Sequence, residues 1–313
     1  MRVRAIMNPR AGVRLPGTLE AVERGRPSWT DYAVGLTRGP GHATELAREA
    51  LAGGADVVIA VGGDGTVNEV ARALLGSPAA LGIVPAGSGN GLARALRLPL
   101  RPERALAALE TAACRAIDVG LLDGRPFLNV AGIGFDAAVG HAFHEHGVRG
   151  GRRGLLGYLR LSLRELRTYR PRRLTVDAFG HDRLVAAPFV LTFANGPQYG
   201  SGAVINPGTK LDDGRLEIVL FEIGPVLQML AAAPRLFLGG LDRSPRYRRL
   251  ATTRASITAE AAFPVHVDGD PEPGTDRVEL ELRPRALRVL VPAGTIADPR
   301  GPFVLSGTAA ASG

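Results

Sequence analysis

Cysteine is nearly absent from this chain, because Cys114 is the only one among 313 residues. One cysteine cannot form an intramolecular disulfide or build a cysteine metal site, which fits a reducing compartment such as the cytosol. Aromatic residues make up only 5% of the sequence, and no basic motif carries interleaved stacking residues. This composition argues against nucleic-acid binding.

Long hydrophobic runs are also missing. The first twelve residues, "MRVRAIMNPRAG", lack the apolar region of a signal peptide, and the most apolar later stretch, 223–241, is interrupted by Gln228, Pro234 and Arg235. We therefore expect no membrane span and a cytoplasmic protein.

Lysine is almost absent as well, since Lys210 is the only one and the formal charge of +8 is nearly all arginine. No Gly-Lys-Ser/Thr sequence occurs, which excludes a P-loop. The positive charge suggests an anionic partner such as phosphate or a membrane surface, although a GC-rich genome also favours arginine. The length and the 45% hydrophobic content predict two domains.

The first hundred residues repeat one theme four times: a short apolar run, a glycine-bearing loop and a helical pattern. The four apolar runs are "VRAIM", "YAVGLT", "VVIAV" and "LGIVP". Alternation of this kind predicts βα units on a parallel sheet, with all four loops at the carboxyl edge of the strands. Four small-residue loops at one edge predict a nucleotide-binding cleft.

From about residue 121 the pattern changes to strand-like runs separated by turns rich in Gly, Pro and Asp. These runs predict an antiparallel β-sandwich or barrel. We expect an ATP-binding α/β domain at 1–120 and a substrate-binding β-sandwich at 121–292, with 293–310 returning to the first domain. An arginine-rich segment at 145–173 and an apolar helix at 225–240 interrupt the β pattern.

The sequence "GGDGT", residues 62–66, places a carboxylate inside a glycine turn that precedes a helical pattern. Glycines ahead of a helix N-terminus let a phosphate approach its backbone N–H groups. Asp64 would repel that phosphate unless a cation lay between them, which predicts a bound Mg²⁺. The alternative is an Asx-type turn that caps the helix.

Four motifs in order, "NPRAG", "GGDGTVNEV", "PAGSGNGLA" and "VDGD", resemble the diacylglycerol kinase catalytic-domain family, which includes sphingosine, ceramide and bacterial diacylglycerol kinases. The resemblance extends from Asn8 to Asp270. It implies a nucleotide domain like those of phosphofructokinase and NAD kinase, followed by the β-sandwich. The GGDGT element alone is less specific, because NAD kinases and 6-phosphofructokinases carry it too.

The resemblance implies a set of residues that contact ATP. From the first three loops these are Asn8, Pro9, Arg10, Ala11, Gly12, Thr37, Gly62, Gly63, Asp64, Gly65, Thr66, Asn68 and Glu69. In the fourth loop Gly87, Ser88, Gly89 and Asn90 would close over the nucleotide.

The resemblance also implies the catalytic and metal residues. The family's general base lies in an Asp-Gly-Glu motif, and Asp270 stands at the matching position. Because aspartate is one methylene shorter, either its loop lies closer to the site or another group is the base. Asp118 would join Asp64 around the catalytic Mg²⁺. A structural Mg²⁺ would be held by the Asp213 carboxylate and the carbonyls of Lys210 and Arg215, although "LDDGRL" is also an ordinary hairpin turn.

The function expected from these motifs is an ATP- and Mg²⁺-dependent lipid kinase of phospholipid metabolism, which phosphorylates a hydroxyl of a diacylglycerol-like or sphingoid-like lipid. The sequence leaves the lipid open. NAD kinase is an alternative because it shares GGDGT and the two-domain plan. A catalytically silent nucleotide or lipid sensor is another, because Asp270 replaces the family glutamate.

A lipid kinase needs access to a membrane surface. Leucines at 156, 159, 163 and 166 follow helical spacing beside arginines at 160, 164 and 167, which is typical of a cationic amphipathic helix on an anionic membrane. Such a helix can equally pack on the β domain. His141, His144 and His146 do not follow a zinc pattern. An exposed sheet edge in the β domain would permit a homodimer.

Overall fold

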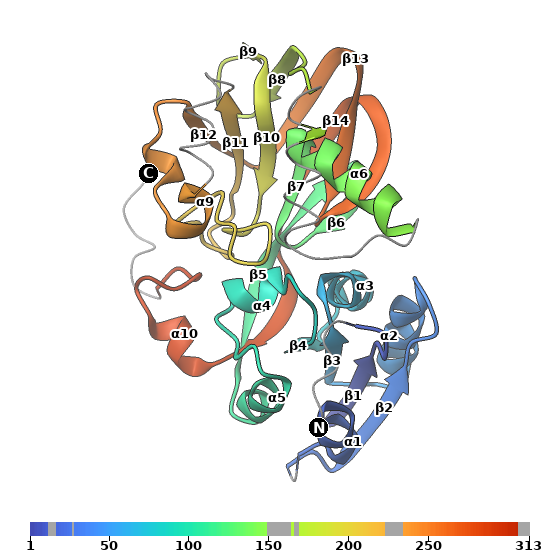
Figure 1. The fold of residues 1–313 in the computed structure, drawn as a ribbon. Helices are drawn as coiled ribbons and strands as arrows, with labels where there is room; N and C mark the ends of the chain where they lie inside the picture. Colours follow the sequence, from blue (N-terminus) through green and yellow to red (C-terminus); the bar gives the residue numbers. More distant parts are fainter. Residues whose placement is uncertain (12–16, 27, 149–163, 166–168, 223–233, 306–313) are drawn as a thin grey trace.

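The computed structural model of the chain describes residues 1–11, 17–26, 28–148, 164–165, 169–222 and 234–305. Its strands form one continuous sheet that passes through two differently built halves (Figure 1). The half that contains the N-terminus is parallel with helices around it, and the other half is antiparallel. The expected combination of an α/β nucleotide domain and a β-sandwich is thus confirmed.

The first half consists of four βα units. Its strands are β1 (Arg2–Met7), β2 (Asp31–Leu36), β3 (Val57–Gly62) and β4 (Ala80–Pro85), and its helices are α1 (Thr18–Arg24), α2 (His42–Ala52), α3 (Asp64–Leu74), α4 (Gly91–Ala95) and α5 (Pro102–Glu110). The strands lie in the order β4-β3-β1-β2 and pair in parallel. Every residue of β3 and β4 is buried, as expected for strands covered on both faces.

The second half is an antiparallel arrangement. Its strands are β6 (Arg125–Phe127), β7 (Val130–Gly134), β8 (Leu174–Ala178), β9 (Leu184–Ala186), β10 (Pro188–Ala194), β11 (Leu216–Glu222), β12 (Tyr247–Thr252) and β13 (Arg254–Val267). Helix α6 (Phe135–Val148) follows β7, and the short α9 (Arg235–Leu238) and a 3₁₀ turn (Leu241–Arg243) precede β12. A separate apolar core lies between these strands and includes Phe127, Phe193 and Phe263.

Two long strands, β5 (Ala113–Leu122) and β14 (Asp270–Val291), connect the halves (Figure 1). β14 begins against β13, pairs with β5, and ends parallel to β4. Its register with β5 shifts between Arg283 and Leu287, where Arg285 has a positive φ of 51°. The sequence predicts two separate strands within the range of β14 and two within the range of β13. In the structure each pair forms one long strand that contains a register shift.

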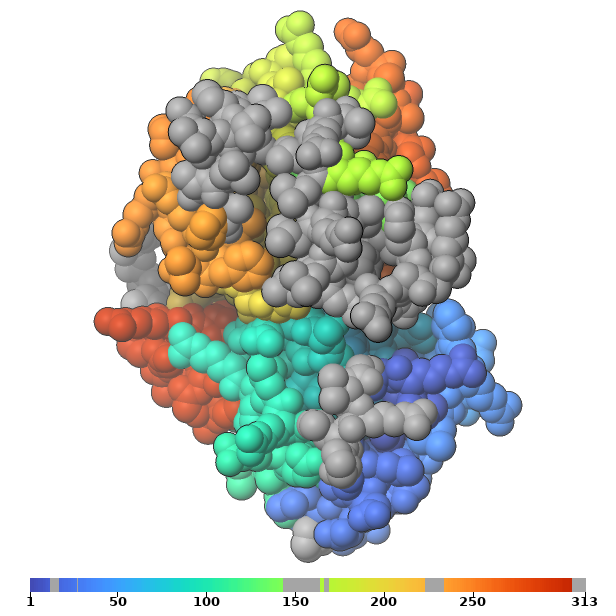
Figure 2. All heavy atoms as spheres, viewed as in Figure 1, coloured from blue at the N-terminus to red at the C-terminus, as the bar shows by residue number. Residues whose placement is uncertain are grey.

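The C-terminal segment returns to the first half. Leu287, Val289, Val291 and Phe303 are fully buried in the core of the nucleotide domain. Figure 2 shows this segment, in red, against the teal surface of α4 and α5. Helix α10 (Ala293–Ala297) lies within it. The domain limits stay a prediction, and the buried side chains indicate that the return begins by Leu287, before residue 293.

Two predicted features lie largely outside the described residues. These are the amphipathic helix around 153–173, of which the structure describes Arg164, Glu165 and the residues from Tyr169, and the apolar helix at 225–240, of which it describes the end from Pro234. Within the described ranges, no helix combines the length and apolar character that a membrane crossing needs.

Candidate functional site

The glycine loops meet at the carboxyl edge of the parallel sheet. Backbone hydrogen bonds extend the strand ladder into them: Asn8 N to Val61 O (3.0 Å), Thr37 N to Met7 O (2.9 Å) and Ala86 N to Gly62 O (2.8 Å). The predicted convergence of the nucleotide loops follows directly from this parallel register.

Asp64 begins α3 and binds the fourth loop. Its Oδ2 accepts the N–H of Asn90 (2.8 Å), and its Oδ1 accepts the N–H of Gly91 (2.6 Å). Burial raises the pKa of the Asp64 carboxyl, while these hydrogen bonds and the charge of Arg94 oppose that rise. The Asp64 carboxylate therefore links the 62–66 loop to the 87–91 loop. Each of its oxygens accepts one of these hydrogen bonds and keeps a second lone pair.

The loop at 87–90 needs its small residues. A Cβ on Gly87 would lie 2.5 Å from the Cα of Gly63, and one on Gly89 would lie 2.5 Å from the Asp64 Oδ2. Asn90 has a left-handed backbone, with a φ of 52°, and its side chain bonds both the N–H and the carbonyl of Gly87. These contacts close the loop on itself.

The "NPRAG" loop is ordered by its own asparagine. Asn8 Oδ1 accepts the N–H of Arg10 (2.9 Å), and Asn8 O accepts that of Ala11 (3.1 Å), while Pro9 lies inside this turn. Asn8 Nδ2 also contacts the Thr66 hydroxyl (3.4 Å). Gly12 lies outside the described residues.

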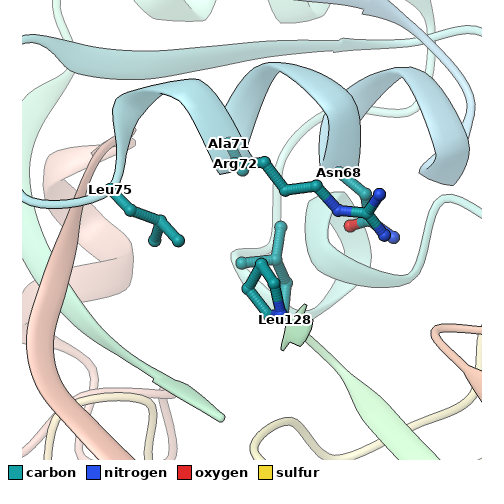
Figure 3. A pocket seen from close by; sticks show the side chains of 6 residues that line it. Asn68, Ala71, Arg72, Leu75 and Leu128 are labelled. Carbon is teal, nitrogen blue, oxygen red and sulfur yellow. The ribbon is translucent and has the colours of Figure 1, made fainter. Parts of the chain in front are cut away.

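Two residues predicted to contact ATP have structural partners instead. Glu69 accepts the N–H groups of Gly41 (2.9 Å) and Ala43 (3.0 Å), so its carboxylate holds the start of α2. Asn68 is buried and lines a small hollow between α3 and the segment around Leu128, as Figure 3 shows. That hollow has no room for a water molecule, so it is not the nucleotide site. The ATP contacts expected of both residues stay predictions.

The hairpin between β13 and β14 brings the late "VDGD" motif to the glycine loops. Val267 pairs with Asp270, and the two residues between them, Asp268 and Gly269, have φ values of 49° and 88°. Such a two-residue turn with both φ positive is type I′, which favours Asp-Gly. Asp270 is thus the first residue after the turn, and it is exposed.

Asp268, which the sequence analysis does not single out, organises this turn. Its carboxylate accepts three backbone N–H groups, from Leu128 (2.7 Å), Asn129 (2.9 Å) and Val130 (3.0 Å). Burial raises the pKa of Asp268 to about 6 against the lowering effect of these bonds, and the negative charge of Asp64 raises it further. The hairpin tip and the glycine loop are therefore within electrostatic reach of each other.

Asp118 is 1% exposed and connects three segments. Its carboxylate accepts the N–H of Gly214 (2.7 Å) and of Arg285 (2.7 Å), and burial raises its pKa. These bonds connect it to the loop of Asp213 and to the bend of β14, whereas the hydrogen bonds of Asp64 go to the 87–91 loop.

The 210–215 loop carries two adjacent carboxylates, Asp212 and Asp213. Burial, followed by the charge of Glu217, raises the pKa of Asp213 to about 6, and Asp118 adds to the effect. The Lys210 ammonium donates to the carbonyls of Pro299 and Gly301. A carboxylate beside loop carbonyls is a donor set that suits Mg²⁺. No cluster of three or more His, Cys, Asp or Glu side chains is placed to hold a metal in the described part of the chain.

Asn129 and Asn195 join the halves behind the hairpin. Asn195 Nδ2 donates to the carbonyls of Asp118 (3.0 Å) and Leu128 (2.9 Å), and Asn129 O accepts the N–H groups of Asn195 and Gly196. The side-chain oxygen of Asn129 is buried without a hydrogen-bond partner. The sequence carries no distinct signal for these residues, since Asn129 lies within one strand-like run and Asn195 near the end of another.

A cavity of about 320 Å³ opens beside the same hairpin. Its apolar lining comes from Leu122, Val265, Val267 and Val278, and Arg125 forms an ion pair with Glu272 at its polar side. The cavity thus gives the hairpin an apolar binding space. The candidate base, Asp270, lies two residues before Glu272 in the same hairpin.

Glycine loops at the carboxyl edge of a parallel sheet, a carboxylate-bearing hairpin and an apolar cavity beside that hairpin are features expected of a kinase. Family models agree with this class. Residues 2–122 match the diacylglycerol kinase catalytic domain, and residues 129–291 match the YegS C-terminal NAD kinase beta sandwich-like domain. The chain belongs to the YegS-like lipid kinases of the diacylglycerol kinase catalytic-domain family.

Individual relatives support this membership. A Pseudomonas fluorescens protein named probable lipid kinase YegS-like is 35% identical over 280 residues, which cover 87% of this chain and 89% of the relative. A solved diacylglycerol kinase from Bacillus anthracis has a TM-score of 0.72 at 22% identity, covering 94% and 97% of the two chains. An NAD kinase from Archaeoglobus fulgidus, solved with ATP, reaches a TM-score of 0.51 at 15% identity and 94% coverage of each chain. The solved structures show the shared fold. Because residues 2–122 match the diacylglycerol kinase model and the 35% identical relative is named a probable lipid kinase, the NAD kinase alternative is not favoured.

Proposed function

We propose that this lipid kinase transfers the γ-phosphoryl group of ATP to a hydroxyl of a diacylglycerol-like or sphingoid-like lipid. One observation carries the proposal. The β13–β14 hairpin brings Asp270 to the end of a turn whose Asp268 responds to the charge of Asp64, and an apolar cavity adjoins the same hairpin.

ATP would bind across the glycine loops. The N-terminus of α3 and the small residues of the 62–65 and 87–90 loops offer backbone N–H groups to its phosphates. The Asn8 turn supports the adjoining loop. All the ATP contacts predicted for the four loops stay part of this proposal, including those of Asn68, Glu69 and Gly12.

In the proposed reaction the lipid hydroxyl oxygen attacks the γ-phosphorus and the bond to the β–γ bridging oxygen breaks, which releases ADP. The Asp270 carboxylate accepts the hydroxyl proton. Asp270 is exposed at the hairpin tip, where a substrate can approach it, whereas the lone pairs of Asp268 accept three backbone N–H groups. This difference supports Asp270 as the base.

Mg²⁺ would neutralise the phosphate charge when bound. Asp64 keeps lone pairs for this role, and the buried Asn129 oxygen without a partner is a further hard ligand of the kind that Mg²⁺ prefers. At a second site Asp213 would act with the carbonyls of Lys210 and Arg215. Asp118 supports that loop through its bond to Gly214.

The acceptor lipid would use the cavity beside the hairpin. Its volume of about 320 Å³ lies at the lower end of the range for small-molecule sites, roughly 300–1,000 Å³. It suits a segment of one acyl chain, which the valine and leucine lining would bury, while the hydroxyl stays near Asp270.

Peripheral membrane association is part of the proposal. Leu238 and Phe237 of α9 are 85% and 56% exposed, and exposed arginines lie nearby at 235, 243 and 248. In Figure 2 the orange segment that contains them forms an outer surface of the β domain. Exposed apolar side chains in a segment that also carries exposed arginines suit an anionic lipid surface. A cytoplasmic location and a homodimer stay predictions.

The first experiment is transfer of labelled γ-phosphate from ATP, with Mg²⁺, to a panel of detergent-dispersed lipid alcohols and, separately, to NAD. Label in one lipid product, strongly reduced in the Asp270→Asn protein and retained in Asp270→Glu, is expected. Label in NAD alone would show a different activity. ATP binding without any labelled product would favour a sensor.

A further inference from the structure

A buried hydrogen-bond chain leads from the β domain to the hairpin turn. The Tyr199 hydroxyl lies 2.5 Å from Thr192 Oγ1 and donates to Asp136 Oδ2 (2.8 Å). The same carboxylate oxygen contacts His266 Nε2 (3.1 Å), and His266 Nδ1 accepts the N–H of Gly269 (3.3 Å). Gly269 is the second residue of the turn that precedes Asp270.

The donors and acceptors of this chain have one consistent arrangement. A backbone N–H can only donate, so Nδ1 of His266 keeps its lone pair and the ring proton lies on Nε2. Nε2 then donates to Asp136. Because the Tyr199 hydrogen is also directed to Asp136, the Thr192 hydroxyl donates to the Tyr199 oxygen. The Asp136 carboxylate thus accepts hydrogen bonds from Tyr199 and His266. It fixes the orientation of the His266 ring, which in turn accepts the N–H of Gly269.

The chain is built into the core. Thr192 and His266 are 0% and 3% exposed, and the Asp136 side chain is 12% exposed. His266 faces Gly132 across the β13–β7 ladder, and a Cβ on Gly132 would lie 2.6 Å from both Asp136 Oδ2 and His266 Nε2. The pair therefore fits only because position 132 lacks a side chain.

The other end of the chain lies next to the nucleotide loop. Two residues after Tyr199, Ser201 donates from its backbone N to Gly89 O (3.0 Å) and from its hydroxyl to Ser88 O (3.3 Å). Gly200 packs against Gly89, since its Cβ would lie 3.5 Å from the Gly89 Cα. One segment, 199–201, therefore touches both the loop that would cover ATP and the chain that holds the hairpin.

We propose that Tyr199, Asp136 and His266 are positioning residues that hold the Asp268-Gly269 turn, and with it Asp270, at a fixed place relative to the 87–90 loop. The inference rests on the proposed function and deepens it. Phosphoryl transfer depends on positioning, because a displacement of about 1 Å costs roughly a hundredfold in rate. The chain acts through Asp270 and does not itself touch the reacting atoms.

The kinetic test uses Tyr199→Phe and His266→Ala in the full-length protein. We expect each to lower kcat by about ten- to a hundredfold with the KM for ATP within about twofold. His266→Asn, whose side-chain oxygen can still accept the Gly269 N–H, should recover part of the loss. Tyr247→Phe is the matched control, since it removes another tyrosine hydroxyl bond of the β domain, to Ile205 O (3.1 Å), away from the hairpin.

A double-mutant cycle separates positioning from general damage. In an Asp270→Asn background, single-turnover label transfer should not fall further when Tyr199→Phe is added, because the group being positioned is gone. An equal fold-loss in both backgrounds, or equal losses in Tyr199→Phe and Tyr247→Phe, would overturn the proposal.

A measurement without substrate keeps this inference distinct from the proposed function. In protein labelled with ¹⁵N-histidine, we expect the NMR shifts of the His266 imidazole to show a protonated Nε2 and an unprotonated Nδ1. The His266 signals are assigned by their absence in His266→Asn. Asp136→Asn should change those shifts. A proton on Nδ1 would overturn the chain, whether or not any lipid is phosphorylated. If the tautomer is as expected but no lipid is labelled, the proposed function alone fails.

Discussion

Asp64 shows how single glycines decide what a carboxylate can do. Its two oxygens reach the N–H groups of Asn90 and Gly91 only because Gly89 leaves space beside Oδ2. The carboxylate is a loop anchor and the candidate Mg²⁺ ligand. The alternative, an Asx-type turn that caps the helix, is wrong, because α3 has no side-chain cap and both Asp64 oxygens bind the 90–91 backbone. A change at the glycine tests the anchor without altering the acid itself.

Gly89→Ala should lower kcat/KM for ATP by about ten- to a hundredfold. The added methyl would lie 2.5 Å from Asp64 Oδ2, so the carboxylate or the loop must move. The matched control is Gly294→Ala in α10, where a Cβ meets nothing within 4 Å. Steady-state kinetics with varied ATP, alongside melting temperatures, would measure the effect; equal activity of both variants would contradict the anchor.

Asp268 should make stability depend on pH in an unusual direction. Its pKa is raised to about 6 from the ordinary 3.8. Between about pH 4 and 6 the folded protein therefore binds more protons at this site than the unfolded chain, and its contribution to stability falls as pH rises. A shift of this size corresponds to at most about 3 kcal/mol.

The comparison is between the wild type and Asp268→Asn in urea unfolding at pH 4.5 and pH 7. The amide places an N–H donor among three backbone N–H groups, so it destabilises the protein at both pH values. The difference in the free energy of unfolding should be larger at pH 4.5. A difference that is constant or grows with pH would mean that the folded-state pKa is not raised.

At the scale of elements, the 210–215 loop carries the proposed second Mg²⁺ site and is bonded through Asp118 to the long strands β5 and β14. Asp213 has its pKa raised to about 6 by burial and by Glu217. Near neutral pH its charge is therefore unfavourable unless a cation offsets it. Asp118, which bonds Gly214 and Arg285, transmits the position of this loop to β5 and β14.

Mg²⁺ without ATP should raise the melting temperature of the wild type by several degrees, since a ligand at 100 times its Kd adds about 2.7 kcal/mol. Asp213→Asn should abolish this gain, because it removes the candidate carboxylate ligand. Asp182→Asn, at an exposed carboxylate between β8 and β9, is the control. An equal Mg²⁺ response in Asp213→Asn would reject the site.

The elements that the sequence predicts are those with local signals. Apolar runs such as 57–61 followed by glycine turns determine the βα units, and the GGDGT and GSGN loops follow from the same pattern. β13 and β14 are longer than predicted, because each joins two strand-like runs of the sequence and pairing with neighbouring strands continues on both sides of the register shift. That pairing is tertiary and leaves no local signal.

The parts of the site that were not predicted have the same physical origin. Asp136, Tyr199 and His266 lie about 65 residues apart along the chain, and only the β7–β13 and β7–β10 registers bring them together. Asp268 looks like an ordinary turn residue in sequence, and its three N–H partners come from residues 128–130. The catalytic residues inherited from the family motifs remain predictions for the experiments above.

At the scale of the whole molecule, an enzyme for bilayer lipids must bring its cavity to the membrane. Phe237 and Leu238 are one exposed apolar pair. Phe179 and Val185, 61% and 46% exposed, are a second pair in the β8–β9 region of the same domain, where the Arg254 guanidinium lies over the Phe179 ring. Apolar area and cationic charge act together at anionic membranes. The two pairs therefore provide a matched comparison.

Replacing Phe237 and Leu238 together by serine should reduce the fraction of protein that sediments with anionic phospholipid vesicles several-fold, because about 25 cal/mol is lost per Å² of apolar area no longer buried. The Phe179→Ser, Val185→Ser protein should bind like the wild type. Binding should also weaken with added salt and on neutral vesicles, since the arginines contribute through screened charge. Kinase activity on detergent-dispersed lipid, which needs no bilayer, should be unchanged in both double variants. Equal vesicle binding of the two variants would show that the membrane contact does not lie at α9.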